Sequence, residues 1–166
     1  MAVRPTHSRL ASRGFHMQMN ERGMALLRQF EGCKLTAYLC PAGVATIGFG
    51  VTGPTIKLGM TITQAQADDM LAKALAPRGD ALDLMLGTVE TTPDEFSAML
   101  CLLYNIGADN FRRSTVLARH LLGNHLGASK AFSLWNKARV QGVMTILPGL
   151  TRRRAAEAKL YLGEPA

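Results

Sequence analysis

The sequence predicts an α+β protein that is mostly helical, with a small antiparallel β-lobe near the N-terminus and a larger helical C-terminal lobe. Most of the chain carries apolar residues at the three- and four-residue spacing of amphipathic helices, often behind a capping residue. The exception is the stretch 35–57, where glycines and prolines interrupt short β-prone runs. No internal repeat or low-complexity linker divides the chain, so we expect one layered domain.

The first helix is predicted to begin after Asn20, whose side chain can cap it, and to run to about Glu31, where Gly32 can end it. The β-prone stretch then predicts a hairpin or a three-stranded antiparallel sheet. Thr63 and Gln66 form a capping box for the helix that follows.

That helix is predicted to run to about Ala76, because Pro77 and Gly79 interrupt its pattern, and a shorter helix is expected to continue to Leu86. Four more helices are predicted at 92–106, which opens with Thr-Pro-Asp-Glu, at 114–122, at 128–138 and at 148–160.

The domain boundary is expected after a basic N-terminal extension. Residues 1–19 are polar and weakly patterned, whereas 20–166 form a single domain with a β-lobe at about 35–60 and a helical lobe at about 63–163. A chain of 166 residues can bury a core without disulfides or metal ions.

The charge of +7 indicates an anionic partner such as nucleic acid, acidic lipid or an acidic cell-wall polymer. It is concentrated at the two ends: 1–34 has six basic and two acidic residues, 35–109 has three and eight, and 110–166 has ten and two. Only 6% of residues are aromatic and no nucleic-acid-binding motif is present, so we expect no nucleic-acid partner.

Metal and cofactor sites are not indicated. The three cysteines, Cys33, Cys40 and Cys101, form no CxxC pair, which argues against a thiolate zinc site or a disulfide framework. His120 and His125 are five residues apart, whereas two ligands on one helix face need a spacing of four. We therefore expect ordinary histidines there, no metal and no organic cofactor.

A glycine motif at 48–53 matches GxGxxG, which is typical of dinucleotide binding only where a helix opens at that point. Pro54 and Thr55 follow instead, so the glycines are interpreted as turn residues. No run of eighteen apolar residues or secretory signal is visible, and the expected location is the cytoplasm.

Three residues bracket the junction between the first helix and the hairpin. Glu31 ends the helix, Cys40 lies at the following turn and Thr46 lies on the next strand. A cleft between two lobes would form at such a junction, and a carboxyl there is placed to act as a general acid in glycoside cleavage.

At these positions the sequence resembles the phage-type (T4-like) lysozymes, the endolysins of glycoside hydrolase family 24. Their signature is a Glu, eight residues, an Asp or Cys, five residues and a Thr, which Glu31, Cys40 and Thr46 match. The resemblance covers roughly 20–162. It continues in the motifs Leu103-Tyr-Asn-Ile-Gly107, Asn110-Phe-Arg-Arg-Ser-Thr115, Trp135-Asn-Lys137 and Leu147-Pro-Gly-Leu-Thr-Arg-Arg-Arg-Ala-Ala-Glu157.

The resemblance implies a muramidase that hydrolyses the β-1,4 bond between N-acetylmuramic acid and N-acetylglucosamine in peptidoglycan, causing host-cell lysis. Glu31 would protonate the leaving oxygen. Cys40 takes the place of an Asp that helps to place water or to stabilise positive charge, and Thr46 would orient that water. Saccharide contacts are implied at Thr52, Tyr104, Asn105, Ser114 and Gly149.

We expect a monomer that accumulates in the host cytoplasm. The family implies that it reaches the cell wall when a holin opens the membrane. The basic final helix suggests a further contact with anionic outer-membrane lipid, through Arg152, Arg153, Arg154 and Lys159.

The sequence departs from the family pattern at two positions. Cys40 is not a carboxylate, and Val51 replaces a family His, which predicts that Glu31 lacks a polar neighbour. Cys33 and Cys40 are close enough in sequence to pair across the turn. Three alternatives remain open: a lytic transglycosylase, a catalytically inactive wall-binding relative and a basic nucleic-acid-binding protein.

Overall fold

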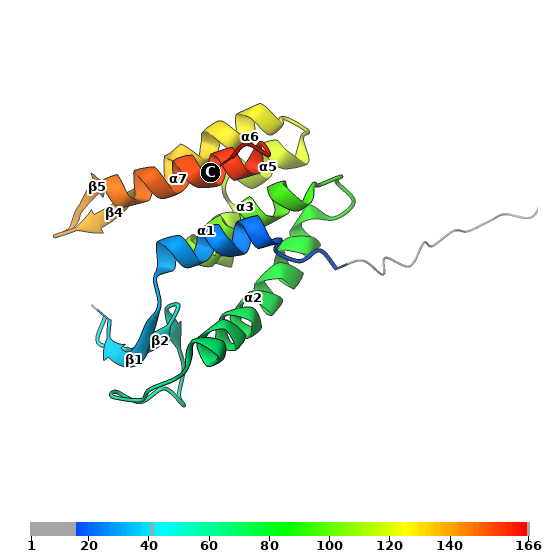
Figure 1. The fold of residues 1–166 in the computed structure, drawn as a ribbon. Coiled ribbons are helices and arrows are strands. Elements are labelled where there is room, and N and C mark those ends of the chain that lie inside the picture. The colour runs from blue at the N-terminus through cyan, green and yellow to red at the C-terminus, as the bar shows by residue number, and fades with distance from the viewer. Residues whose placement is uncertain (1–15, 41, 166) are drawn as a thin grey trace, which may run out of the picture.

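The computed structural model describes residues 16–40 and 42–165 and has the expected α+β architecture (Figure 1). Its elements, in chain order, are α1 (Glu21–Glu31), β1 (Lys34–Leu39), β2 (Ala45–Gly48), β3 (Val51–Thr52), α2 (Gln64–Leu86), α3 (Pro93–Ile106), α4 (Ala108–Arg112), α5 (Thr115–Leu121), α6 (His125–Ala131), the 3₁₀-helix η1 (Phe132–Trp135), β4 (Lys137–Val140), β5 (Val143–Ile146) and α7 (Pro148–Tyr161).

The core is built around α3, which packs against α1, α2 and α7 (Figure 1). Every residue from Glu95 to Leu103 is buried, so this helix is surrounded rather than amphipathic. Its predicted start is confirmed: Thr92 Oγ1 accepts from the Glu95 N–H at 3.2 Å, and the Glu95 carboxylate accepts from the Thr92 N–H at 2.8 Å.

The β-lobe is a three-stranded antiparallel sheet in the order β1-β2-β3, as predicted. Its register places Thr46 opposite Thr52 and Ile47 opposite Val51. The strands β2 and β3 contact α2, which carries the lobe on one end (Figure 1).

The prediction that α2 breaks at Pro77 is wrong, since one helix runs through it. Proline removes a backbone donor and displaces the preceding turn, which leaves carbonyls there short of partners. Leu75 and Gly79, on either side of Pro77, are buried, so tertiary packing rather than local pattern keeps the helix continuous. The Arg78 side chain adds a bond in this turn, in which Nη1 donates to the Ala74 carbonyl at 2.6 Å. Gly79 is buried and lies close to the ring of Phe96 on α3.

The predicted helix at 128–138 is also wrong in its second half, where η1 and the strand β4 replace it. The hairpin β4–β5 was not predicted at all. Its two-residue turn has positive φ at Gln141 (47°) and Gly142 (86°), as a type I′ turn requires. Glutamine is not a usual first residue of that turn, and all four residues of β5 are exposed, so neither turn chemistry nor alternation revealed it.

Most of the predicted N-terminal extension lies outside the described residues, but its last part packs on α2. The Met17 N–H donates to Asp83 Oδ2 at 3.0 Å, and Met17 and Met19 contact the core. The expected flexible arm therefore does not include residues 16–19.

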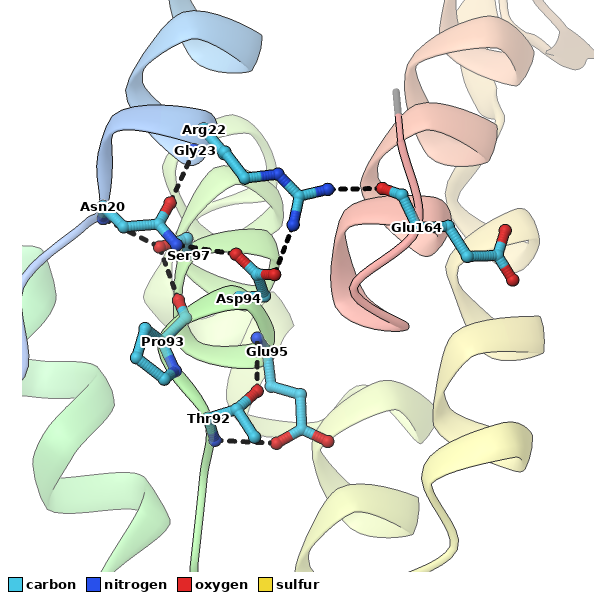
Figure 2. A network of polar contacts seen from close by, with 9 residues as sticks. All are labelled: Asn20, Arg22, Gly23, Thr92, Pro93, Asp94, Glu95, Ser97 and Glu164. Atoms are coloured by element: carbon cyan, nitrogen blue, oxygen red, sulfur yellow. Dashed lines mark hydrogen bonds and ion pairs between the residues drawn. The ribbon is translucent and has the colours of Figure 1, made fainter.

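A polar network ties both ends of the described chain to the start of α3 (Figure 2). The Asn20 backbone N–H donates to Ser97 Oγ at 2.9 Å, and its side-chain amide donates to Asp94 Oδ1 at 2.7 Å. Arg22 forms an ion pair with Asp94 and donates to the carbonyl of Glu164. Asp94 thus joins the beginning of α1 to the C-terminal segment.

We expect Asp94→Ala to lower the free energy of unfolding by about 1–3 kcal/mol, because the donors of Asn20 and Arg22 lose their acceptor. The matched control is Asp109→Ala, which removes an 82% exposed side chain paired with Arg112 and should change stability by less than about 0.5 kcal/mol. Urea denaturation followed by circular dichroism measures both. Equal losses in the two variants would contradict the anchoring role of Asp94.

Candidate active site

Glu31 is the last residue of α1, and its side chain is 18% exposed. Its Oε1 lies 2.7 Å from Nη1 of Arg153, which comes from α7 and is itself buried. The prediction that Glu31 lacks a polar neighbour is therefore wrong. A guanidinium from α7, rather than a side chain at position 51, provides the polar neighbour of Glu31.

Arg153 belongs to a buried ionic cluster on α7. Its Nε donates to Glu157 Oε1 at 3.0 Å, and Arg154 Nη2 donates to the same oxygen at 2.8 Å. Glu157 is fully buried, and this burial outweighs its two guanidinium neighbours and raises its pKa to about 7. The cluster holds Arg153 in place against Glu31.

This cluster corrects the proposed lipid contact of the final helix. Arg153 and Arg154 are 5% and 1% exposed and are paired inside the protein, so they cannot reach a membrane surface. Of the four predicted contacts, Arg152 and Lys159 are exposed. Two of the three consecutive arginines are therefore paired inside the protein, and the local indication of this in the sequence is the Glu four residues after Arg153.

Tyr104 joins the helical core to the β-lobe close to Glu31. Its hydroxyl donates to the Phe49 carbonyl at 3.0 Å, and the Arg78 guanidinium lies 5.0 Å from its ring centroid. Burial, followed by the negative charge of Glu31, raises the pKa of Tyr104, so the hydroxyl remains a donor.

Gly50 brings the turn after β2 against the carboxyl of Glu31. Its φ is +85°, a conformation that favours glycine, and a Cβ built there would lie 3.8 Å from Glu31 Oε2. One carboxyl oxygen of Glu31 therefore meets α7, and the other faces the β-lobe.

Cys40 and Thr46 lie beside the turn that joins β1 to β2. The Val44 carbonyl accepts from both the Cys40 N–H at 3.0 Å and the Thr46 hydroxyl at 2.9 Å. Hydrogen bonds from the backbone at Val44 and Ala42, and a smaller one from Thr46, lower the pKa of the Cys40 thiol. Thr46 is 4% exposed, and its ladder partner Thr52 is exposed beside it.

The remaining predicted saccharide contacts differ in exposure. Asn105 is exposed near the end of α3, and Gly149 is exposed in the first turn of α7. Gly149 lines a shallow depression together with Phe30, the residue before Glu31. Ser114 is 2% exposed and accepts from the Leu117 N–H at 3.1 Å as the N-cap of α5. We therefore assign Ser114 a structural role and leave it out of the proposed site.

All three cysteines are free thiols. The suggestion that Cys33 and Cys40 could pair is wrong, because the six residues of β1 separate them. An extended strand of that length spans roughly 20 Å, whereas a disulfide needs Cα atoms within about 7 Å.

The phage lysozyme family model matches residues 28–157. The chain belongs to the phage lysozyme family. It is 39% identical over 145 residues to the endolysin of Acyrthosiphon pisum secondary endosymbiont phage 1, which covers 87% of this chain and 98% of that one. The lysozyme-type fold and activity of phage endolysins therefore apply to this protein, which is a glycosidase.

Solved structures of the family agree with the fold. The endolysin of Escherichia coli O157:H7 phage FAHEc1 superposes with a TM-score of 0.85 at 36% identity, covering 92% of this chain and 99% of that one. The muramidase domain of SpmX from Asticaccaulis excentricus gives 0.82 at 32% identity, covering 88% and 98%. Among the helices in the described part of the chain, none is both long and apolar enough to cross a membrane.

The raised pKa of Glu157 predicts a pH dependence of stability. A carboxyl whose pKa rises from an ordinary 4.5 to about 7 on folding contributes stability that is complete below pH 4.5 and is lost as the pH rises through 7. We expect unfolding free energies of the wild type to fall by on the order of 2 kcal/mol between pH 5 and pH 8, relative to Glu157→Gln.

Urea denaturation of both proteins at several pH values measures this difference. The glutamine variant keeps the shape of the side chain and has no titratable group, so it corrects for all other groups. If the unfolding free energies of the two proteins changed equally with pH, the raised pKa of Glu157 would be contradicted.

Proposed function

We propose that the protein hydrolyses the β-1,4 bond between N-acetylmuramic acid and N-acetylglucosamine in peptidoglycan, with Glu31 as the general acid. The observation that carries the proposal is the placement of the Glu31 carboxyl between the two lobes, with Arg153 at 2.7 Å on one side and the turn at Gly50 on the other. The muramidase domain among its structural relatives supports the choice of substrate.

The two oxygens of Glu31 suggest different tasks. Oε1 is occupied by the Arg153 guanidinium, which fixes the orientation of the carboxyl. Oε2 faces Gly50, where the absence of a side chain leaves room for a substrate. We therefore assign the transferred proton to Oε2, from which it passes to the glycosidic oxygen as the bond to the muramic acid carbon breaks.

Cys40 and Thr46 are proposed to hold the water that attacks the sugar. The Thr46 hydroxyl donates its hydrogen bond to the Val44 carbonyl, so its oxygen can accept a hydrogen bond from that water. The Cys40 thiol shares the same turn and offers sulfur as a second acceptor. Direct attack by water requires no covalent thioglycoside.

We further propose that the enzyme acts after release from the host cytoplasm through a holin-dependent membrane lesion, as a monomer. The exposed side chains of Thr52 and Asn105, the exposed backbone of Gly149 and the half-buried Tyr104 are the proposed saccharide contacts. They come from the β-lobe (β3) and from the helical lobe (α3 and α7), as a substrate that lies between the lobes would require.

Glu31→Gln should lower cell-wall clearing by at least about 100-fold, because the amide has no proton to give. The matched control is Glu21→Gln, which changes the exposed first residue of the same helix and should leave clearing unchanged. Turbidity of chloroform-treated Gram-negative cells measures the rates, and circular dichroism checks the fold. Near-normal clearing by Glu31→Gln would show that another group is the acid.

Mass spectrometry of the muropeptides released by the wild type identifies the reaction. Hydrated, reducing muramic acid ends support hydrolysis, whereas 1,6-anhydro ends would indicate a lytic transglycosylase. Wall binding without soluble products would indicate an inactive relative.

A substitution series at Cys40 tests the water-holding role. Cys40→Asp should retain a rate within about 10-fold of the wild type, since a carboxylate also accepts from water, and Cys40→Ser should retain less. Cys40→Ala should lose at least about 10-fold. Cys33→Ser is the control, because Cys33 lies at the far end of β1. Full activity of Cys40→Ala would make the position merely structural.

A further inference from the structure

A second polar cluster lies at the opposite end of α3 from Tyr104. Four helices contribute one side chain each: Glu95 from α3, His120 from α5, His125 from α6 and Tyr161 from α7. Glu95 and Tyr104 are nine residues apart on α3, which is roughly 14 Å along the helix. The cluster is therefore separate from the proposed catalytic residues.

The histidines meet because they belong to different helices. Their spacing of five residues excludes a shared site on one helix, but the turn at Leu122–Asn124 reverses the chain between α5 and α6. The ring centroids of His120 and His125 lie 5.5 Å apart, and their planes are nearly perpendicular. The spacing argument applies only within one continuous helix, whereas these two histidines lie on two helices.

Donor atoms converge on a small volume. His125 Nδ1 lies 2.6 Å from Glu95 Oε1, and the Tyr161 hydroxyl lies 2.6 Å from His120 Nδ1 and 3.4 Å from His125 Nδ1. One ligand atom from each of Glu95, His120 and His125 falls within 4.8 Å of the others. Figure 2 shows how Glu95 is held: one carboxyl oxygen accepts from the Thr92 N–H, and the other points away from it.

The hydrogen bonds around His120 are compatible with the tautomer that a metal site needs. The Thr91 hydroxyl lies 3.2 Å from the Val89 carbonyl and 2.9 Å from Nε2 of His120, so it can donate to the first and accept from the second. With the ring proton on Nε2, Nδ1 faces the cluster as an acceptor. An outer hydrogen bond of this kind orients imidazole ligands in metal sites.

We propose that this cluster binds one divalent transition-metal ion of the zinc class through Glu95 Oε1, His120 Nδ1 and His125 Nδ1. Two imidazole nitrogens and one carboxylate oxygen are a donor set that zinc prefers, and the Tyr161 oxygen or a water completes four-fold coordination.

Binding requires two small adjustments. Ligand atoms bonded to the same tetrahedral zinc at about 2.0–2.1 Å lie about 3.4 Å apart, so His125 must withdraw from Glu95, which it contacts at 2.6 Å. His125 can do this because its side chain is 45% exposed. Its ring proton moves from Nδ1 to the outer Nε2. The Tyr161 hydroxyl, 2.6 Å from His120 Nδ1, must also release that nitrogen so that its lone pair is free. The bound ion would then link α3, α5, α6 and α7 and stabilise the fold.

The test is a titration of the metal-free protein with Zn²⁺ alone by isothermal calorimetry, in the Cys33→Ser, Cys40→Ser background so that thiolates do not compete. We expect one ion per chain and a raised melting temperature. His125→Ala and Glu95→Gln should each weaken Zn²⁺ binding by about 100-fold or more. His16→Ala is the matched control, since His16 is also exposed and lies near the carboxylates of Asp80 and Asp83. The His16→Ala variant should bind Zn²⁺ with the affinity of the parent protein.

A second measurement does not depend on any variant. Long-range ¹H–¹⁵N spectra of the histidine side chains should show Zn²⁺ shifting Nδ1 of both His120 and His125, and leaving His16 unchanged. The proposal is overturned if Zn²⁺ does not bind, or if the stoichiometry and affinity of His125→Ala equal those of the control. It is also overturned if the shifted nitrogens belong to other histidines.

Discussion

The contact on which the site depends is the ion pair between Glu31 and Arg153, because it joins residues from nearly opposite ends of the chain. Arg153 is buried, and a buried guanidinium is costly unless its charge is paired. Glu31 pairs with it at 2.7 Å, and Glu157 in the next turn of α7 accepts hydrogen bonds from both Arg153 and Arg154. The surrounding packing of α1, α3 and α7 therefore determines how the Glu31 carboxyl is oriented.

The turn between β2 and β3 connects the β-lobe to the surroundings of Glu31 through two contacts described above. Tyr104 donates to the Phe49 carbonyl, and Gly50 lets the turn approach the Glu31 carboxyl. Both contacts involve the backbone of the same turn, so a small displacement of the lobe would change the space beside Glu31 without disturbing its pairing with Arg153. This separation lets one side of the carboxyl stay fixed while the other side meets the substrate.

Local signals predicted most of the fold. Capping residues at Asn20, Thr63, Thr92 and Ser114 each mark a helix start that the structure contains. The two helix errors share the lack of a local pattern that would reveal them. The helix α2 continues through Pro77, with buried residues on both sides of the proline, and all four residues of β5 in the hairpin after η1 are exposed.

The same limit applies to the site. The spacing of Glu31, Cys40 and Thr46 identified the helix–hairpin junction, but Arg153 was interpreted as a surface residue. Nothing local distinguishes a buried arginine from an exposed one in a run of three. Only the fold brings it to Glu31, and only the fold brings His120 and His125 together across a turn.

The distance in sequence between Glu31 and Arg153 has a consequence for how the enzyme comes into being. The two residues are 122 positions apart, and Arg22 reaches the carbonyl of Glu164 across 142 positions. Neither contact can form until both of its partners have been synthesised, and closing so long a loop costs more entropy than closing a short one. During synthesis, the Glu31 carboxyl at the end of α1 therefore has no Arg153 to pair with until α7 has been made. The nascent chain has no assembled acid until nearly its whole length has emerged.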